Sequence, residues 1–394
     1  MNTNGRFEKA VLELSRVKSF DEPVYVTRPN LPPLNAYARV LMPAWKRHWL
    51  TNDGVLHARL ESALAERFDL PCFRLFSSGT MALLTAFQAL GCKDGAVITT
   101  PFTFPATINT LHWHGLRPMF CDIEPRTCNM DASGIEALIT ADTRAILPVH
   151  VFGTPCDVDA IQAVADRHGL PVIYDAAHAF GVDYKERSIL QYGAMSIVSF
   201  HATKLFTTGE GGALASRDKE LYEKLGTLKN FGIDDEGRVV APGLNAKMSE
   251  LHAALGLTQL ETVAREIKGR RGVAMRYNDH LKEIPGIAPL ALDLAHVKRN
   301  YAYYPVRVDR ESYGMTSDAL YTQLKRFNIH ARRYFHPLCS TQSWCRVAPG
   351  RLPVAEKAAE EMLCLPLYGV LPLEWVDVIC DVIAQLGAIA RESA

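Results

Sequence analysis

The stretch AILPVHVFGTPCDVDAIQAVADRHGLPVIYD, residues 145–175, decides the fold class. It begins with the apolar run 145–151, continues with a helix-period segment at 158–168 and ends with the apolar run 171–174. Strands that are apolar on both faces and joined by helices are typical of a mostly parallel sheet covered on both sides. The stretch therefore predicts a strand–helix–strand unit of an α/β domain.

The same alternation extends to both sides of this unit. Short apolar runs predict further strands, and segments of helical period predict helices between them; the strands are expected at 72–75, 96–99, 118–122 and 196–200, and the helices at 79–90 and 104–114. Beyond Gly243 the pattern changes to one long helix at 248–271, a strand at 303–308 and helices at 317–326 and 373–391. We expect a large α/β domain at 1–260, with an N-terminal arm, and a smaller α+β domain at 261–394.

Composition and charge exclude several classes of protein. The 394 residues are 48% hydrophobic and 22% charged, as in ordinary folded proteins, and 43 basic residues balance 43 acidic ones. A zero net charge lacks the basic footprint of a nucleic-acid binder. No apolar run approaches the roughly 20 residues that cross a bilayer. Residues 1–16 carry charges among their apolar positions and predict a short amphipathic helix or a mobile arm, not a signal peptide.

The cysteines and histidines predict no metal site. The nine cysteines are scattered, form no CxxC pair and mostly lie in apolar runs, which favours reduced, buried thiols in a cytoplasmic protein. His112 and His114 stand two residues apart, so they do not share a helix face.

Three predicted strand ends carry polar residues, and ligands of doubly wound sheets bind at the carboxyl ends of strands. Phe76-Ser77-Ser78-Gly79-Thr80 opens a helix and would suit a phosphate or serve as a simple helix cap. Asp175 closes an apolar strand, where it needs a cationic or hydrogen-bonding partner or caps a helix. Lys204 follows a third strand and is a candidate nucleophile, although a lone lysine more often extends to solvent.

Together these three strand ends match what pyridoxal phosphate (PLP) requires. Lys204 would bind the cofactor covalently, and Asp175 would keep its ring nitrogen protonated so that the ring can accept electrons. Gly79, Thr80 and Ser199 would hold its phosphate.

The sequence also resembles a known family over residues 49–260. The motifs SSGTMAL, TFPATIN, PVHVFGTPCDVDAI, DAAHAFG, SFHATKLFTTGEGGAL and LNAKMSELHAALG are similar to those of the DegT/DnrJ/EryC1/StrS nucleotide-sugar aminotransferases. The resemblance implies the α/β architecture of fold type I PLP-dependent aminotransferases and a homodimer with shared active sites. It also implies L-glutamate as amino donor and a nucleotide-linked keto-sugar as acceptor.

The resemblance assigns roles to matching residues. Catalysis falls to Lys204, Asp175 and His178, the last standing where the family usually has Gln. Phe104 would stack on the cofactor, and Asn245 would reach the phosphate of the neighbouring subunit's cofactor. The implied cofactor site comprises Gly79, Thr80, Phe104, Asp175, His178, Ser199, Lys204 and Asn245, and the implied substrate contacts are Thr51, Asn52, His201, Tyr334 and His336.

Several questions stay open at this level. The run WLTNDG at 49–54 and FHATK at 200–204 resemble the branch that aminates C4 of dTDP-4-keto-6-deoxyglucose, but the nucleotide, sugar and carbon are not fixed. A dehydratase or amino-group synthase of the same fold and a non-enzymatic regulatory protein remain alternatives. Arg332 and Arg333 could bind a substrate diphosphate or face solvent.

Overall fold

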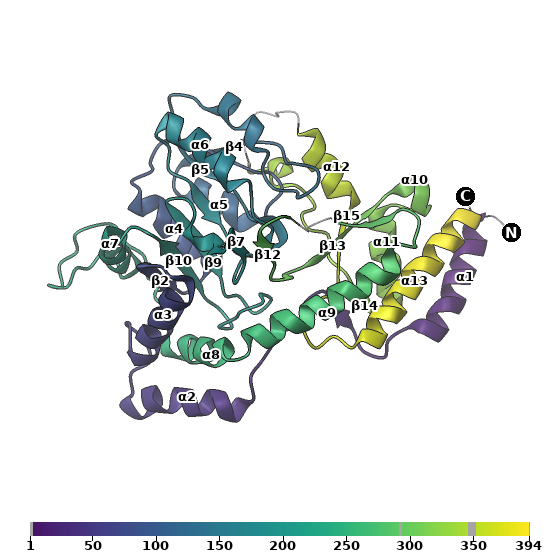
Figure 1. The fold of residues 1–394 in the computed structure, drawn as a ribbon, viewed down its shortest axis with the longest axis horizontal. Coiled ribbons are helices and arrows are strands. Elements are labelled where there is room, and N and C mark those ends of the chain that lie inside the picture. The colour runs from purple at the N-terminus through teal and green to yellow at the C-terminus, as the bar shows by residue number, and fades with distance from the viewer. Residues whose placement is uncertain (1–2, 291–293, 346–351, 394) are drawn as a thin grey trace.

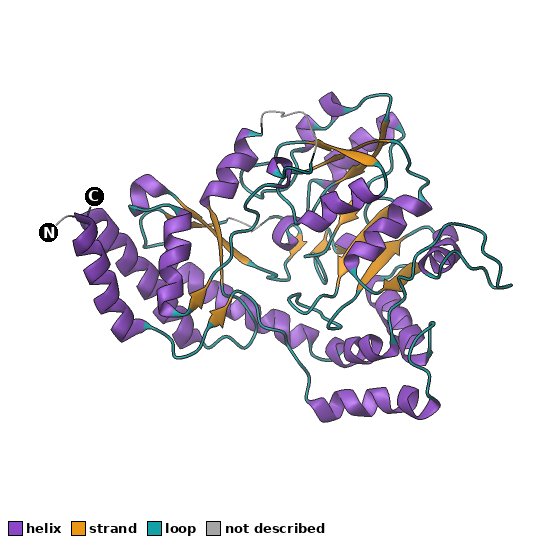
Figure 2. Ribbon diagram, turned by 180° about the vertical axis from the view of Figure 1, so that it is seen from behind, coloured by secondary structure: helices purple, strands orange, loops and turns teal. Residues whose placement is uncertain are grey.

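A computed structural model describes residues 3–290, 294–345 and 352–393 in two packed bodies (Figure 1). The larger body contains a central sheet between helices, and the smaller one gathers the C-terminal strands and helices beside it (Figure 2). Within the described residues, no helix is both long enough and apolar enough to span a membrane.

Seven strands build the central sheet. β2 (Cys72–Phe76), β10 (Gly212–Ser216), β9 (Met195–Ser199) and β6 (Ile173–Asp175) are neighbours in that order, and β5 (Thr143–Leu147), β3 (Gly95–Thr99) and β4 (Leu116–Phe120) continue it. Bridges from Ile146 to Val172 and from Val149 to Asp175 join β5 to β6. All neighbours run parallel except β10, which is antiparallel to both β2 and β9. The predicted mostly parallel α/β sheet is therefore confirmed.

Alternate strand residues feed two separate cores, one on each face of the sheet. Tyr174 and Val198 pack into a core with α3 (Val55–Phe68), α6 (Val158–His168) and α8 (Glu250–Leu260). Ile173 and Ile197 point the other way, toward α4 (Gly79–Ala89) and α7 (Glu220–Lys229). This period-2 burial on both faces explains why the strands are continuously apolar in sequence.

Two features of the chain differ from the sequence expectation. β10 was missed, because its residues GALAS are small and have little intrinsic strand preference. The predicted single helix at 248–271 is two helices, α8 and α9 (Val263–Leu281), separated at Thr262. The Thr262 hydroxyl donates to the Gln259 carbonyl oxygen at 3.1 Å, and such side-chain bonds compete with continuous helical pairing.

The smaller body is an antiparallel sheet with helices against it. β13 (Tyr304–Val308) lies between β11 (Ile287–Pro289) and β15 (Met362–Leu365), and α9, α11 (Ser317–Leu324) and α13 (Leu373–Glu392) complete its core. The remaining elements are β1 (Val24–Tyr25), α2 (Leu34–Arg47), α5 (Pro105–Trp113), β7 (Asp183–Tyr184), β8 (Arg187–Ser188), β12 (Val297–Lys298), α10 (Arg310–Tyr313), β14 (Ile329–His330) and α12 (Pro353–Glu361).

The N-terminal arm is an amphipathic helix that packs on the smaller body. α1 (Thr3–Lys18) lies along α13 (Figure 1), with Val11 buried in that core and Lys18 paired to Asp381 at 2.8 Å. The arm that the sequence assigned to the large domain thus joins the C-terminal core, because its apolar stripe matches the exposed stripe of α13.

A buried charged cluster joins α3, α7 and β2. Lys229 is fully buried, and its Nζ lies 3.1 Å from Asp53 Oδ1 and 4.0 Å from Glu61 Oε2. Glu61 also accepts from the backbone N–H of Leu75 at 3.0 Å and pairs with Arg74. Burial lowers the pKa of Lys229, and the two carboxylates oppose that shift. The cluster fixes the loop of Asp53 against the strand that leads into residues 77–80.

We expect Lys229→Ala to lower the free energy of unfolding by about 3 kcal/mol, because it removes the buried cation that lies between Asp53 and Glu61 and leaves its space unfilled. Denaturant unfolding measures the change. Lys224→Ala, an exposed lysine on the same helix, is the matched control and should stay within about 0.5 kcal/mol of wild type. Equal effects of the two variants would show that the cluster does not stabilise the fold.

Candidate active site

A pocket of about 280 Å³ lies at the carboxyl ends of β6 and β9, where α4 begins. Asp175 is the last residue of β6 and Ser199 the last of β9, so the strand order itself brings them together. The lining residues come from both bodies: Ser78, Gly79, Thr80, Leu83, Thr103, Phe104, Ala106, Thr107, Val149, Asp175, Ala177, His178, Ile197, Ser199, His201, Thr203, Lys204, Glu210, Gly211, Arg332, Tyr334 and Phe335.

Asp175 is a buried carboxylate without a directly paired cation. Its Oδ2 accepts from the Thr107 hydroxyl at 2.8 Å and its Oδ1 from the backbone N–H of Ala177 at 3.0 Å. Burial raises the pKa of Asp175, while these two donors and the more distant charge of Lys204 oppose the rise. No ion pair to Asp175 is present among the described residues. The carboxylate is thus ready for a positively charged group inside the pocket.

Lys204 lies beside this carboxylate with its amino group shielded from solvent. Its Nζ donates to the Tyr303 hydroxyl at 3.4 Å, a long hydrogen bond. Burial lowers the pKa of Lys204; the negative charge of Asp175 opposes the shift and the positive charge of Arg332 adds to it. The neutral amine, which is the nucleophilic form, is therefore available at lower pH than in an exposed lysine.

His178 lines the pocket as a neutral imidazole. Burial, with the charge of Lys204, holds its pKa well below the ordinary value. Its ring lies nearly parallel to that of Phe335, with centroids 6.2 Å apart, and 4.7 Å from that of Tyr303. Nδ1 is buried and has no hydrogen-bond partner within the described chain. A buried polar nitrogen of this kind is suited to a ligand atom.

The start of α4 offers an anion site. Ser78 caps the helix by accepting from the Met81 N–H at 3.1 Å, and Gly79 and Thr80 follow at its first turn. A Cβ on Gly79 would lie 3.2 Å from the Ser199 Cβ, so glycine permits the close approach of α4 to β9. The free N–H groups of a first helical turn bind phosphate well.

Nine of the residues predicted from the sequence line this pocket: Gly79, Thr80, Phe104, Asp175, His178, Ser199, His201, Lys204 and Tyr334. Thr51, Asn52, Asn245 and His336 do not line it. Asn245 is exposed, and its Oδ1 accepts from Lys247 Nζ at 3.0 Å. The roles of all these residues stay predictions.

Sequence reasoning missed two polar side chains that form hydrogen bonds with Asp175 and Lys204. Thr107 donates to Asp175, and Tyr303 contacts Lys204 from the smaller body. Thr107 stands within the TFPATIN motif, so the resemblance carried a signal for it. Tyr303 lies 99 positions from Lys204 in a run of tyrosines, where nothing in the sequence distinguishes it.

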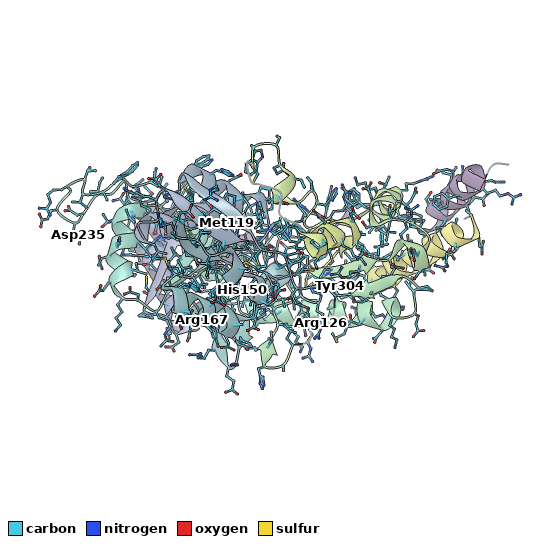
Figure 3. All side chains as sticks on the ribbon, turned by 90° about the horizontal axis from the view of Figure 1, so that it is seen from above. Met119, Arg126, His150, Arg167, Asp235 and Tyr304 are labelled. Carbon is cyan, nitrogen blue, oxygen red and sulfur yellow. The ribbon has the colours of Figure 1, made fainter. Side chains whose placement is uncertain are left out.

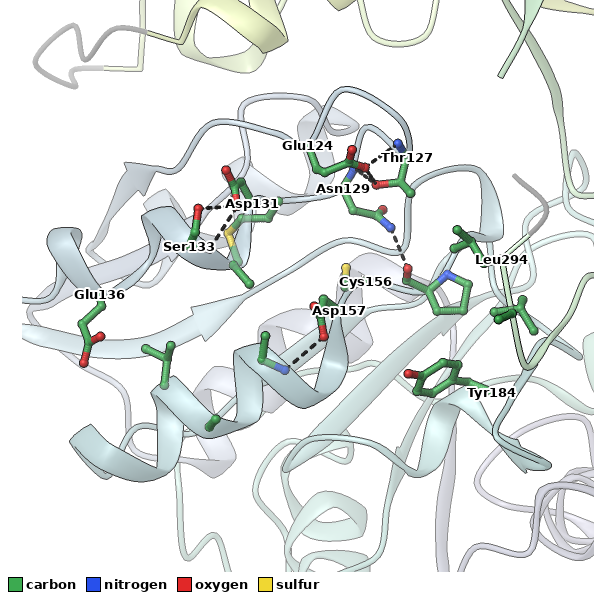
Figure 4. A pocket seen from close by; sticks show the side chains of 18 of the residues that line it. Glu124, Thr127, Asn129, Asp131, Ser133, Glu136, Cys156, Asp157, Tyr184 and Leu294 are labelled. Atoms are coloured by element: carbon green, nitrogen blue, oxygen red, sulfur yellow. Dashed lines mark hydrogen bonds between the residues drawn. The ribbon is translucent and has the colours of Figure 1, made fainter. Parts of the chain in front are cut away.

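A second, larger pocket of about 780 Å³ lacks the combination of a buried lysine, an unpaired carboxylate and a helix N-terminus among its described lining residues (Figure 4). Three of its carboxylates accept within local turns, Glu124 from Thr127, Asp131 from Ser133 and Asp157 from the Ala160 N–H. The fourth, Glu136, pairs with Arg167 at 2.9 Å. Burial raises the pKa of its Cys156 thiol, which donates to the Val149 carbonyl oxygen. The smaller pocket is therefore the candidate active site.

Comparison with known proteins identifies the family. Residues 37–384 match the model described as the DegT/DnrJ/EryC1/StrS aminotransferase family. The chain belongs to this family. Its predicted membership is confirmed, and the enzyme is a sugar aminotransferase by family.

Relatives of this aminotransferase carry informative names. A protein of Shigella dysenteriae called dTDP-4-amino-4,6-dideoxy-D-glucose transaminase is 43% identical over 368 residues, covering 93% of this chain and 100% of that protein. One of the same name from Escherichia coli is 43% identical over 355 residues, covering 88% and 94%. The structure of DesI in the presence of its TDP-sugar product superposes with a TM-score of 0.91 at 34% identity, covering 95% of each chain.

We expect Lys204 of this aminotransferase, in protein stripped of any bound ligand, to react with a small amine-selective reagent at lower pH than the lysine of a short unstructured peptide. The reason is its pKa, which lies below the ordinary 10.5. Peptide mapping of the two lysines over a pH series measures both midpoints. Coinciding midpoints would contradict the proposed electrostatics of the pocket.

Proposed function

We propose that this aminotransferase uses PLP to transfer the amino group of L-glutamate to a dTDP-linked keto-6-deoxyhexose, with dTDP-4-keto-6-deoxyglucose as the favoured acceptor. The observation that carries the proposal is the meeting of Lys204, Asp175 and the start of α4 in one pocket. The names of the transaminases that are 43% identical and of the TDP-sugar complex support the acceptor.

The pocket residues fit PLP. The carboxylate of Asp175 suits a protonated ring nitrogen, and the first turn of α4 with Ser199 suits the phosphate. The Nδ1 of His178, which has no hydrogen-bond partner within the described chain, suits an oxygen on the ring. The imidazole would thus take the place of the Gln side-chain amide that the family usually has at this position. Phe104, half-exposed at the pocket wall, offers an aromatic face. When bound, PLP supplies a ring that accepts the electron pair left on the carbon next to the amino group.

The chain's own residues move the protons. Lys204 Nζ takes the proton from the Cα of the amino donor, and in the second half-reaction it returns a proton to the sugar carbon that receives nitrogen. The Tyr303 hydroxyl holds Nζ while it is free. Asp175, supported by Thr107, keeps the ring nitrogen charged throughout. Burial excludes water from these groups and strengthens their interactions.

We also propose a homodimer with shared active sites. Asn245 is exposed and lies outside its own chain's pocket, as a residue serving a neighbour would. The segment that precedes it projects from the body with Asp235 near its tip (Figures 1 and 3). Large apolar side chains are exposed on this segment and around α2, including Phe231, Val239 and Trp45. Such exposure is typical of contact surfaces.

The thiols favour a reducing compartment. All nine cysteines are free and buried, as in proteins of the cytoplasm, which we propose as the location.

The first test is the near-visible absorbance of the purified protein. We expect a yellow, PLP-loaded protein that bleaches on addition of L-glutamate and regains its colour with a dTDP-linked keto-sugar. A yellow protein indifferent to glutamate would contradict the transaminase assignment and favour a same-fold dehydratase or a regulatory protein.

Lys204→Ala should lose amino transfer while its circular dichroism and oligomeric state stay those of wild type.

Subunit mixing tests the shared site. Lys204→Ala and Asn245→Ala chains should each be impaired, and one intact site should form in every mixed dimer. After unfolding and refolding an equal mixture, about a quarter of the wild-type activity should return. No recovery, with mixed dimers demonstrated by mass spectrometry, would place Asn245 in its own subunit's site.

A further inference from the structure

The adjacent residues Arg332 and Arg333 have different surroundings. Arg333 pairs with Asp318 at 2.6 Å, so its charge is balanced. Arg332 lines the pocket, and within the described chain no carboxylate lies within ion-pair distance of it. Its guanidinium carbon is 4.9 Å from the centroid of the Tyr334 ring. The pocket therefore holds an unbalanced guanidinium near Lys204, which lowers the pKa of that lysine.

In the extended segment 329–332, His330 and Arg332 lie on the same side of the chain. Ile329 and Ala331 are buried, whereas His330 and Arg332 are not. This alternation is that of an extended chain, in which residues two apart share a face and lie about 7 Å from each other. Backbone hydrogen bonds to Cys364 in both directions, at 3.0 and 2.8 Å, fix Arg332 in this register.

An exposed aromatic pair continues this face away from the pocket. β1 pairs parallel with β14, with Tyr25 opposite His330. Their ring centroids are 4.9 Å apart, and Tyr25 is 57% exposed. Aromatic rings held at a fixed position and open to solvent are suited to stacking on a flat ligand.

We propose that Arg332, His330 and Tyr25 form the subsite for the nucleoside diphosphate of the acceptor, with Arg332 on the diphosphate and the Tyr25–His330 pair against the base. This inference rests on the proposed function. The order of groups along the face, from Lys204 through Arg332 to Tyr25, follows the order of ketone, diphosphate and base in a nucleotide-linked keto-sugar. A guanidinium binds phosphate oxygens in a bidentate manner, which lysine cannot do.

Calorimetric titration with thymidine diphosphate tests the subsite. The protein is first supplied with PLP, so that the start of α4 does not compete for the ligand's phosphate. Arg332→Gln should weaken binding about tenfold or more, through loss of charge-assisted hydrogen bonds, and Tyr25→Ala about fivefold or more, through loss of stacking. Arg333→Gln is the matched control for charge and should bind within about twofold of wild type. Tyr25→Phe keeps the ring and should retain binding.

Inorganic pyrophosphate separates the two parts of the subsite because it has no base. Measured as a competitor of thymidine diphosphate, it should lose affinity in Arg332→Gln and keep it in Tyr25→Ala. Equal weakening by Arg332→Gln and Arg333→Gln would reduce the arginine effect to general electrostatics and overturn the assignment of Arg332. Unchanged thymidine diphosphate affinity in Tyr25→Ala, or no binding to wild type, would overturn the subsite.

These outcomes are distinct from failure of the proposed function. The glutamate half-reaction involves no nucleotide, so bleaching of the wild-type protein by glutamate tests the transaminase, whereas Tyr25→Ala and Arg332→Gln test nucleotide binding. In turnover, both variants should raise the KM for the keto-sugar. Bleaching without altered nucleotide affinity would overturn the subsite alone, whereas altered affinity without bleaching in wild type would overturn the transaminase and leave the nucleotide subsite standing.

Discussion

The rest of the site depends on the burial of one carboxylate at the end of β6. Asp175 is held by a hydroxyl from α5 and a backbone N–H two residues on, and neither donor carries a charge. Two neutral donors do not compensate the loss of water around a carboxylate, so its pKa rises and the pocket favours a cation. The same dry surroundings lower the pKa of Lys204. Exclusion of water at this edge of the sheet thus has two effects in one pocket: it makes the carboxylate of Asp175 favour a cationic ligand, and it makes the amine of Lys204 more nucleophilic.

The sheet and the second body both serve that exclusion. Strand order makes the ends of β6 and β9 neighbours, with Asp175 opposite Ile197 and Ser199 two residues further along. The small side chain of Ser199 and the absence of one at Gly79 let α4 approach closely enough to present its first turn. The C-terminal body completes the pocket: Tyr334 and Phe335 line it, and the Tyr303 hydroxyl contacts Lys204. The α1 helix packs on that body through α13, so both chain ends support the wall rather than the sheet.

The basic residues in and near this pocket differ in whether a carboxylate pairs with them. The buried Lys229 at the end of α7 lies beside two carboxylates, whereas no carboxylate of the described chain lies within ion-pair distance of Lys204 in the pocket. Arg333 is paired with Asp318, whereas its neighbour Arg332 has no ion pair within the part of the chain that the structure describes. Lys204 and Arg332, which have no ion pair among the described residues, both line the same pocket.

The sequence alone determined the α/β class, most strands and helices, and the three strand ends that carry Gly79, Asp175 and Lys204, because apolar runs and their period encode burial directly. Its motifs also determined the family. It did not reveal β10, whose small residues carry no strand signal, or the break at Thr262, whose hydroxyl donates to the Gln259 carbonyl oxygen. Only the tertiary structure brought Tyr303 to Lys204 across 99 positions, placed Thr107 on Asp175, and gave Arg333 a carboxylate while leaving Arg332 to the pocket. These contacts join segments that are distant in the chain, and local sequence patterns do not predict which distant side chains come into contact in the folded protein.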